Sequence, residues 1–354
     1  MGGSSGSPKF SMSTRPHKIP RTVWALGLVS LFMDMSSELV HSLLPVFLVS
    51  TLGASVITVG LIEGVSEAAT PIVKVFSGAI SDFFRRRKIL ILLGYGMAAL
   101  TKPLFPLAAS AESVFVARIL DRIGKGIRGA PRDALVADVA PPAIRGACFG
   151  LRQSMDTVGA VLGPLLAMLL MFWLANDIKL VLWFAVPPAI ITVLLIVVGV
   201  EEPEHKSKGP RFQSPIRADA LKQFSGDYWR LVAVGAIFTL ARFSEAFLVL
   251  RAMQAGFSIT WVPLVMVVMS LVYAASAFPA GIISDRVNRH SLLAIGLLLL
   301  IAADLVFAWA GSPLVILLGV ILWGLHMGFT QGILAAMVAD VTPPELKGTA
   351  FGLF

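Results

Sequence analysis

The chain has 354 residues, of which 56% are hydrophobic and only 14% are charged, with a formal net charge of +8. Soluble globular domains carry about 25% charged residues, so this composition excludes an ordinary soluble domain. Apolar runs of roughly 20 residues, long enough to cross a hydrocarbon core of about 30 Å, recur along the chain. We predict an all-α polytopic membrane protein, with the lipid bilayer as its surroundings.

Sequence motifs of common enzymes and metal sites are missing. No HExxH or P-loop pattern occurs in the sequence, and its one GxSxG match, GGSSG at 2–6, lies in the polar start of the chain rather than between a strand and a helix. Cys148 is the only cysteine, which excludes an intramolecular disulfide and a cysteine-based metal cluster. We therefore predict no enzymatic activity, no cofactor, no resident metal ion and no nucleic-acid partner.

A polar segment precedes the first predicted helix. Residues 1–20 are rich in Gly, Ser and Pro, so we expect a disordered cytoplasmic tail rather than a cleaved signal peptide. Six helices are predicted near 23–49, 56–81, 89–109, 114–139, 147–174 and 180–200. A polar loop at 201–227 separates this bundle (21–200) from a second one (228–354). The second bundle has helices near 229–252, 259–283, 291–310 and 314–340, and an eleventh helix begins at Gly348.

The orientation is predicted from the positive charges that flank the helices. The Lys and Arg residues on one side of the membrane lie within 9–21, 85–88 and 206–222, and at Arg145, Arg286, Arg289 and Lys347. Lys179 is the only Lys or Arg in the short loops on the opposite side. The positive-inside rule then places the amino terminus and the central loop in the cytoplasm. We expect a plasma membrane, which in a bacterium is the inner membrane.

The chain contains an internal repeat. ADVAPPAIRGACFGL at 137–151 returns as ADVTPPELKGTAFGL at 339–353, an offset of 202 residues (339 − 137). GAISDFFRRR at 78–87 returns as GIISDRVNRH at 281–290, an offset of 203 (281 − 78). Two loops that keep their order and spacing indicate two copies in the same membrane orientation, which is one architecture of transporters.

These loops, together with an Arg-bearing fourth helix, resemble the major facilitator superfamily (MFS), whose loop pattern is Gly-x-Leu-Ala/Ser-Asp-Arg-x-Gly-Arg-Arg/Lys. The resemblance covers nearly the whole chain after residue 20 and implies two pseudo-symmetric six-helix halves. Because only ten complete helices and the start of an eleventh are predicted, we expect a truncated sequence of a transporter. The matching loop residues are Gly78, Asp82, Arg86, Arg87, Gly281, Asp285, Arg286 and Arg289.

Two interpretations of these loop residues stay open. The residues alone are compatible with a positive-inside anchor, in which Arg and Lys reach into the headgroup region. The resemblance adds a conformational latch, in which Asp82 faces the amino end of the eleventh helix, where the helix dipole favours an anion.

The fourth predicted helix carries an unusual charge density in RILDRIGKGIRGAPRD, residues 118–133. At 100° per residue its basic side chains fall within an arc of about 120°, with Asp121 on the same arc. At roughly 3 kcal/mol per central charge, five bases facing lipid would cost about 15 kcal/mol, which is as much as the net stability of a protein. The charged face must therefore contact protein or a water-filled cavity.

Acidic partners lie on neighbouring helices, at helical spacing. Asp34 and Glu38 share one face of the first helix with His41, and Glu63 and Glu67 share one face of the second. These charges could simply hold six helices together. The repeat favours a function instead, because the tenth helix reads VILWGLHMGFTQGILA in the equivalent place, where every charged residue is replaced and only His326 is titratable.

The resemblance also implies that the first, fourth, seventh and tenth helices line a central cavity. Our candidates for binding substrate and protons are Asp34, Glu38, His41, Glu63, Glu67, Lys102, Arg118, Asp121, Arg122, Lys125, Arg128, Arg242 and Glu245. Among these, Asp34, Glu38 and Glu67 are the expected proton carriers, since a carboxyl group that exchanges Arg partners can titrate during a transport cycle.

The fifth predicted helix carries Gly150, Gly159, Gly163 and Pro164 in a spacing that resembles the antiporter motif of MFS exporters. Close packing of small residues is the competing interpretation of the same glycines.

Three functions remain open from the sequence. The first is proton-coupled efflux of small organic molecules by a monomeric transporter. The second is uptake or exchange of an anionic metabolite held by cavity Arg and Lys residues, with a divalent-metal carrier using Asp34, Glu38 and His41 as a minor variant. The third is a non-transporting membrane receptor or assembly partner.

Overall fold

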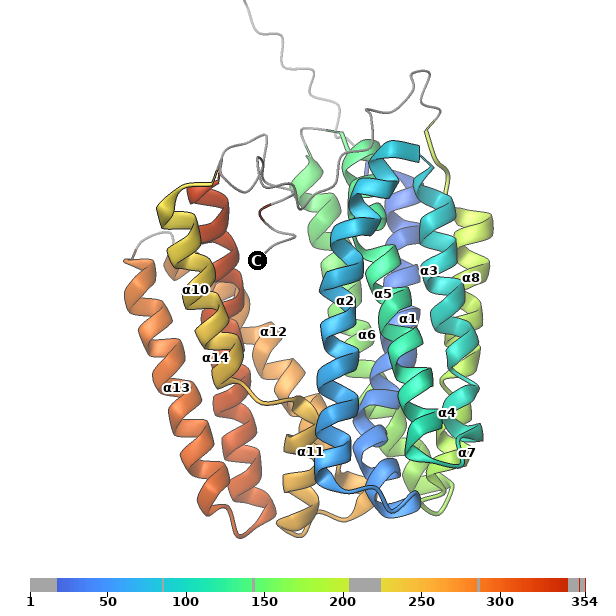
Figure 1. Ribbon diagram of the computed structural model, residues 1–354, viewed down its shortest axis with the longest axis vertical. Helices are drawn as coiled ribbons and strands as arrows, with labels where there is room; N and C mark the ends of the chain where they lie inside the picture. Colours follow the sequence, from blue (N-terminus) through green and yellow to red (C-terminus); the bar gives the residue numbers. More distant parts are fainter. Residues whose placement is uncertain are drawn as a thin grey trace, which may run out of the picture.

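The computed structural model describes residues 18–84, 86–141, 144–203, 224–284, 287–342, 350 and 354, and the regular elements in this part of the chain are all helices. The amino-terminal half contains α1 (Arg21–Val46) with its π-helical extension η1 (Phe47–Thr51), α2 (Val56–Phe84), α3 (Arg87–Thr101), α4 (Leu104–Leu107), α5 (Ala111–Val139), α6 (Arg145–Trp173), α7 (Ile178–Trp183) and α8 (Val186–Gly199). The carboxyl-terminal half contains α10 (Gly226–Ala241), α11 (Glu245–Gln254), η3 (Ile259–Trp261), α12 (Leu264–Ser284), α13 (Arg289–Trp309) and α14 (Pro313–Val341). The two groups of helices stand side by side (Figure 1).

Nine helices in the described residues are long and apolar enough to cross a membrane. The 29-residue α5 is as long as the others but is not among these nine, in keeping with its many charges. The predicted all-α polytopic fold is confirmed.

Three of the spans are divided into two α-helices each, which the sequence prediction did not include. The breaks separate α3 from α4, α7 from α8, and α10 from α11. Pro103 follows Lys102 at the first break, and a proline has no backbone N–H to donate within a helix. At the third break, Ser244 caps α11 by accepting a hydrogen bond from the Ala246 N–H.

The internal repeat is visible in how the helices pack. In the amino-terminal half α5 packs against both α2 and α3, and in the carboxyl-terminal half α14 packs against both α12 and α13. Arg87 at the start of α3 pairs with Asp138 near the end of α5 at 2.7 Å, and Arg289 at the start of α13 pairs with Asp340 near the end of α14. The two ion pairs are related by the 202-residue offset of the repeat.

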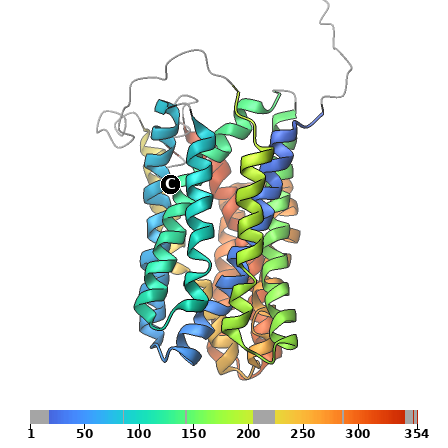
Figure 2. The ribbon, with the colours of Figure 1, turned by 90° about the vertical axis from the view of Figure 1, so that its right-hand side faces the viewer.

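Apolar packing joins the two halves at one end of the bundle. A single core contains Leu39 and Leu43 of α1 together with Ala246 and Val249 of α11, and it lies towards the end opposite the amino terminus (Figures 1 and 2). At that end the Thr260 hydroxyl also donates to the side-chain oxygen of Asn176 at 2.7 Å. Nearer the amino-terminal end, the described residues form one separate core in each half. The halves are therefore held together mainly at one end.

Glycines allow α6 to approach α1 closely. A Cβ atom added at Gly159 would lie 2.4 Å from the Leu31 carbonyl oxygen, and one added at Gly163 would lie 2.6 Å from the Met35 carbonyl oxygen. The same two positions would touch the side chains of Asp34 and Glu38. The spacing of these glycines is thus accounted for by helix packing, and the packed surface includes two of the candidate acids.

Replacing Gly159 by Ala is expected to destabilise the protein by about 1–3 kcal/mol, because the added methyl group meets a backbone carbonyl that cannot rotate away. The measurement is thermal unfolding of the purified protein in detergent. Gly96→Ala in α3 is the matched control, since nothing lies within 4 Å of a Cβ added there. An unchanged melting temperature for Gly159→Ala would contradict the described α1–α6 contact.

Candidate functional site

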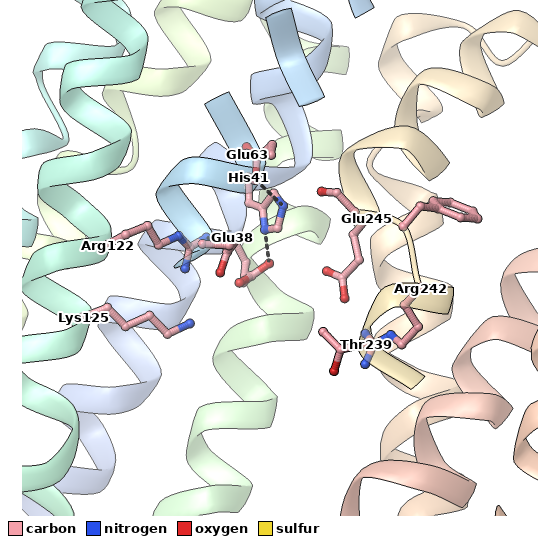
Figure 3. Close-up of a pocket in the computed structure, with 12 residues that line it drawn as sticks. Glu38, His41, Glu63, Arg122, Lys125, Thr239, Arg242 and Glu245 are labelled. Atoms are coloured by element: carbon pink, nitrogen blue, oxygen red, sulfur yellow. Dashed lines mark ion pairs between the residues drawn. The ribbon is translucent and has the colours of Figure 1, made fainter. Parts of the chain in front are cut away.

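A cavity of about 570 Å³ lies between the two groups of helices (Figure 3). The amino-terminal half contributes side chains from α1, α2 and α5, and the other half contributes the break between α10 and α11. The lining residues are Glu38, His41, Glu63, Gly64, Glu67, Arg122, Lys125, Thr239, Arg242, Phe243, Ser244 and Glu245. The cavity is therefore polar and is shared by both halves.

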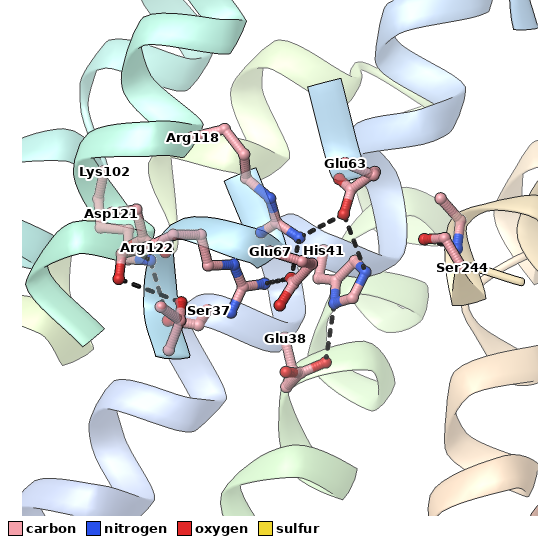
Figure 4. A network of polar contacts seen from close by, with 12 residues as sticks. Ser37, Glu38, His41, Glu63, Glu67, Lys102, Arg118, Asp121, Arg122 and Ser244 are labelled. Atoms are coloured by element: carbon pink, nitrogen blue, oxygen red, sulfur yellow. Dashed lines mark hydrogen bonds and ion pairs between the residues drawn. The ribbon is translucent and has the colours of Figure 1, made fainter. Parts of the chain in front are cut away.

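On the amino-terminal side, two arginines of α5 hold two glutamates of α2 (Figure 4). The Arg118 guanidinium lies 2.8 Å from the Glu63 carboxylate and 3.4 Å from that of Glu67, and Arg122 lies 2.9 Å from Glu67. Arg118 and Glu63 are each only 1% exposed, whereas the Glu67 side chain is 49% exposed. Glu67 thus joins a buried charge network to the open cavity.

The imidazole of His41 extends this network towards α1. Its Nδ1 atom lies 3.6 Å from the Glu38 carboxylate and its Nε2 atom lies 3.9 Å from the Glu63 carboxylate. Both separations exceed those of ordinary hydrogen bonds. The ring is consequently placed between two carboxylates without being firmly bonded to either.

Five of the candidate residues are not on the cavity lining. Lys102 donates to Asp121 at 2.9 Å and to the Ser37 hydroxyl at 3.0 Å inside the amino-terminal bundle. Arg128 stacks 4.4 Å above the Tyr95 ring. The Asp34 side chain faces α6, where its carboxyl group meets that of Asp156, and Arg118 lies behind the two glutamates.

The structure adds cavity residues that the sequence reasoning did not select, namely Gly64, Thr239, Phe243 and Ser244. Three of these lie at the end of α10 or in the break that follows it. A serine followed by a glutamate is a typical start of a helix, so Ser244–Glu245 carried a signal for this break.

The proposed loop residues are described only in part. The Asp82 side chain and residues Asp285 and Arg286 lie outside the described part of the chain. Gly78 faces Ala130 of α5, Arg86 and Gly281 are exposed, and Arg87 and Arg289 form the ion pairs given above. Gly150 and Pro164 lie within α6.

The fold and the cavity together define an integral multi-pass membrane protein with a polar site between two structurally related halves. Among the described residues, no group of three His, Cys, Asp or Glu side chains is placed to hold a metal ion. The amino-acid sequence matches the Major Facilitator Superfamily over residues 26–354. The chain belongs to this superfamily, and its general activity is solute transport across a membrane.

Individual relatives agree with this membership. An uncharacterized MFS-type transporter of Methanocaldococcus jannaschii is 31% identical, with 95% of this chain and 84% of the relative covered. A probable 4-methylmuconolactone transporter of Cupriavidus pinatubonensis is 28% identical, with 93% and 76% covered. Among solved structures, a bacterial homolog of the human lysosomal transporter Spinster, inward-facing and unoccupied, superposes with a TM-score of 0.73 at 18% identity, with 95% and 78% covered. The last comparison supports the fold.

Proposed function

We propose that this protein moves a small organic solute through the central cavity by alternating access, that protons drive the cycle, and that the solute is exported. The observation that carries the proposal is the placement of titratable side chains from both halves around one cavity. Both walls of this cavity come from one chain, which supports a monomeric transporter.

The packing of the two halves supports alternating access. They share an apolar core at the end opposite the amino terminus and have separate cores nearer the amino-terminal end. If the positive-inside rule places the amino terminus in the cytoplasm of a plasma membrane, the described state is closed towards the outside. Rocking of the halves about the cavity would then expose it to the other face.

Glu67 is our first candidate for the proton site. Its carboxylate is half exposed and is paired with two arginines of α5. A proton on this carboxylate would weaken both pairs, so proton binding would change how α2 is held against α5. Glu38 and Asp34 are the further candidates, because both lie on α1 where α6 packs. The resemblance of the α6 glycines to an antiporter motif supports export.

The test uses the full chain in liposomes with a pH-sensitive dye inside. We expect an imposed pH gradient to drive accumulation of a transported solute, and addition of that solute without a gradient to move protons. The screen uses matched organic anions and organic cations, and protein-free liposomes are the control. Solute flux that neither responds to a pH gradient nor moves protons would reject proton coupling.

A further inference from the structure

We propose that the transported solute is an organic anion whose acidic groups pair with Lys125 of α5 and Arg242 at the α10–α11 break. This inference rests on the proposed transport function and adds the chemical class of the substrate.

The first observation concerns the hydrogen bonds and ion pairs of the cations. Arg118, Arg122 and Lys102 each contact a carboxylate. Lys125 and Arg242 line the cavity, yet neither forms an ion pair or a side-chain hydrogen bond with any described residue. The Nε atom of Arg242 is buried and without a hydrogen-bond partner there. A buried donor without a partner is costly, so the Arg242 guanidinium favours a ligand, and the Lys125 ammonium has no described ion pair that a ligand would have to displace.

The second observation concerns the carboxylates of the same cavity. Glu63 and Glu67 are engaged with arginines, and Glu38 lies beside the His41 ring. Glu245 is the one cavity carboxylate for which the described residues provide no ion pair. The cavity lining has no excess of Lys and Arg over carboxylates, so an anion would be held by the two cations that lack a described ion pair and not by a net positive charge of the cavity.

The third observation is the position of the two cations. Lys125 extends from α5 on one side of the cavity, and Arg242 extends from the facing half (Figure 3). An anion that reaches both would contact both halves, as a substrate must when it influences their relative movement. The guanidinium of Arg242 can bind a carboxylate through two parallel hydrogen bonds. The ring of Phe243 lines the same cavity and offers an apolar surface to an organic body.

The experiment measures binding to the purified full chain in detergent, first as ligand-induced thermal stabilisation and then as affinity. The probes are benzoate and terephthalate as anions, and benzyltrimethylammonium as a cation of similar size. We expect at least one carboxylate to stabilise the wild-type protein and the ammonium probe not to do so. Lys125→Gln and Arg242→Gln should each weaken carboxylate binding by about ten-fold or more.

Glu245→Gln is the discriminating variant, because it removes a negative charge from the same cavity. Carboxylate affinity should increase in this variant. Arg230→Gln is the matched control for Arg242, since Arg230 lies on α10 and is 84% exposed, and the exposed Lys179→Gln is the control for Lys125. Both controls should bind as the wild type does.

Two outcomes would overturn the inference. One is binding of the ammonium probe that is lost in Glu245→Gln, which would identify a carrier of cations. The other is absence of carboxylate binding to the wild-type protein. Carboxylate binding with the expected variant effects, but without proton-linked flux in liposomes, would instead reject the proposed function and leave the anion site standing.

Discussion

Replacing Asp121 by Asn is expected to lower the free energy of unfolding by about 3–5 kcal/mol, because the change leaves the Lys102 ammonium buried without its carboxylate. Both side chains are nearly inaccessible, at 1% for Lys102 and 3% for Asp121, and the ammonium lies 2.9 Å from the carboxylate. The hydroxyl of Ser37 is the other hydrogen-bond partner of this ammonium, and it carries no charge. The measurement is denaturation of the purified protein in detergent.

Two further variants make this prediction specific. The double variant Lys102→Met with Asp121→Asn removes both charges, and we expect it to recover most of the lost stability. Asp227→Asn is the control, because Asp227 pairs with Arg230 on the surface, with side chains 71% and 84% exposed. An exposed ion pair contributes about 0–1 kcal/mol. Equal destabilisation by Asp121→Asn and Asp227→Asn would show that the Lys102–Asp121 pair is not buried.

The second large effect concerns function. Glu67→Gln is expected to abolish accumulation driven by a pH gradient while solute counterflow across the liposome membrane continues. Glutamine keeps the size of the side chain but cannot carry the exchangeable proton, and it cannot neutralise Arg118 and Arg122. Arg118 retains its 2.8 Å pair with Glu63, and Arg122, which loses its described ion-pair partner, lines the cavity rather than the closed interior of the bundle, so the bundle should remain folded. Paired counterflow and gradient-driven assays on the same liposomes measure the two activities separately.

The control for this prediction is Glu112→Gln, which removes an exposed carboxylate from the start of α5. Both transport activities should be unchanged in that variant. If Glu67→Gln kept normal gradient-driven accumulation, Glu67 would not be the proton site, and Glu38 and Asp34 would be tested next. If Glu67→Gln lost counterflow as well, Glu67 would belong to the solute site rather than to proton coupling alone.

Much of the architecture follows from local features of the sequence. Apolar length determines which segments can span a membrane, and the cost of charge in lipid requires the basic face of α5 to point inwards. The duplicated loops predicted two related halves, and packing of α2 and α3 on α5 matches packing of α12 and α13 on α14. These conclusions depend on periodicity and composition, which a single chain displays directly.

Tertiary structure determines which partner each charged side chain of α5 contacts. One face of the helix carries Arg118, Asp121, Arg122 and Lys125. Asp121 nevertheless pairs with Lys102 and Arg118 pairs with Glu63, whereas Lys125 forms no ion pair with a described residue. Helical spacing determines the face that a side chain occupies. The partner it meets depends on the rotation and crossing of helices that lie far apart in the sequence.

The α10–α11 break, in the other half, also shows what the sequence alone could and could not predict. Ser244–Glu245 is a recognisable helix start, so the interruption was readable from the sequence. The position of this break opposite Lys125 could not be read from the sequence. The two come close only when two halves with separate cores close around one cavity. Residue spacing thus determined the helices and their polar faces, and the docking of the two halves determined which polar faces became a site.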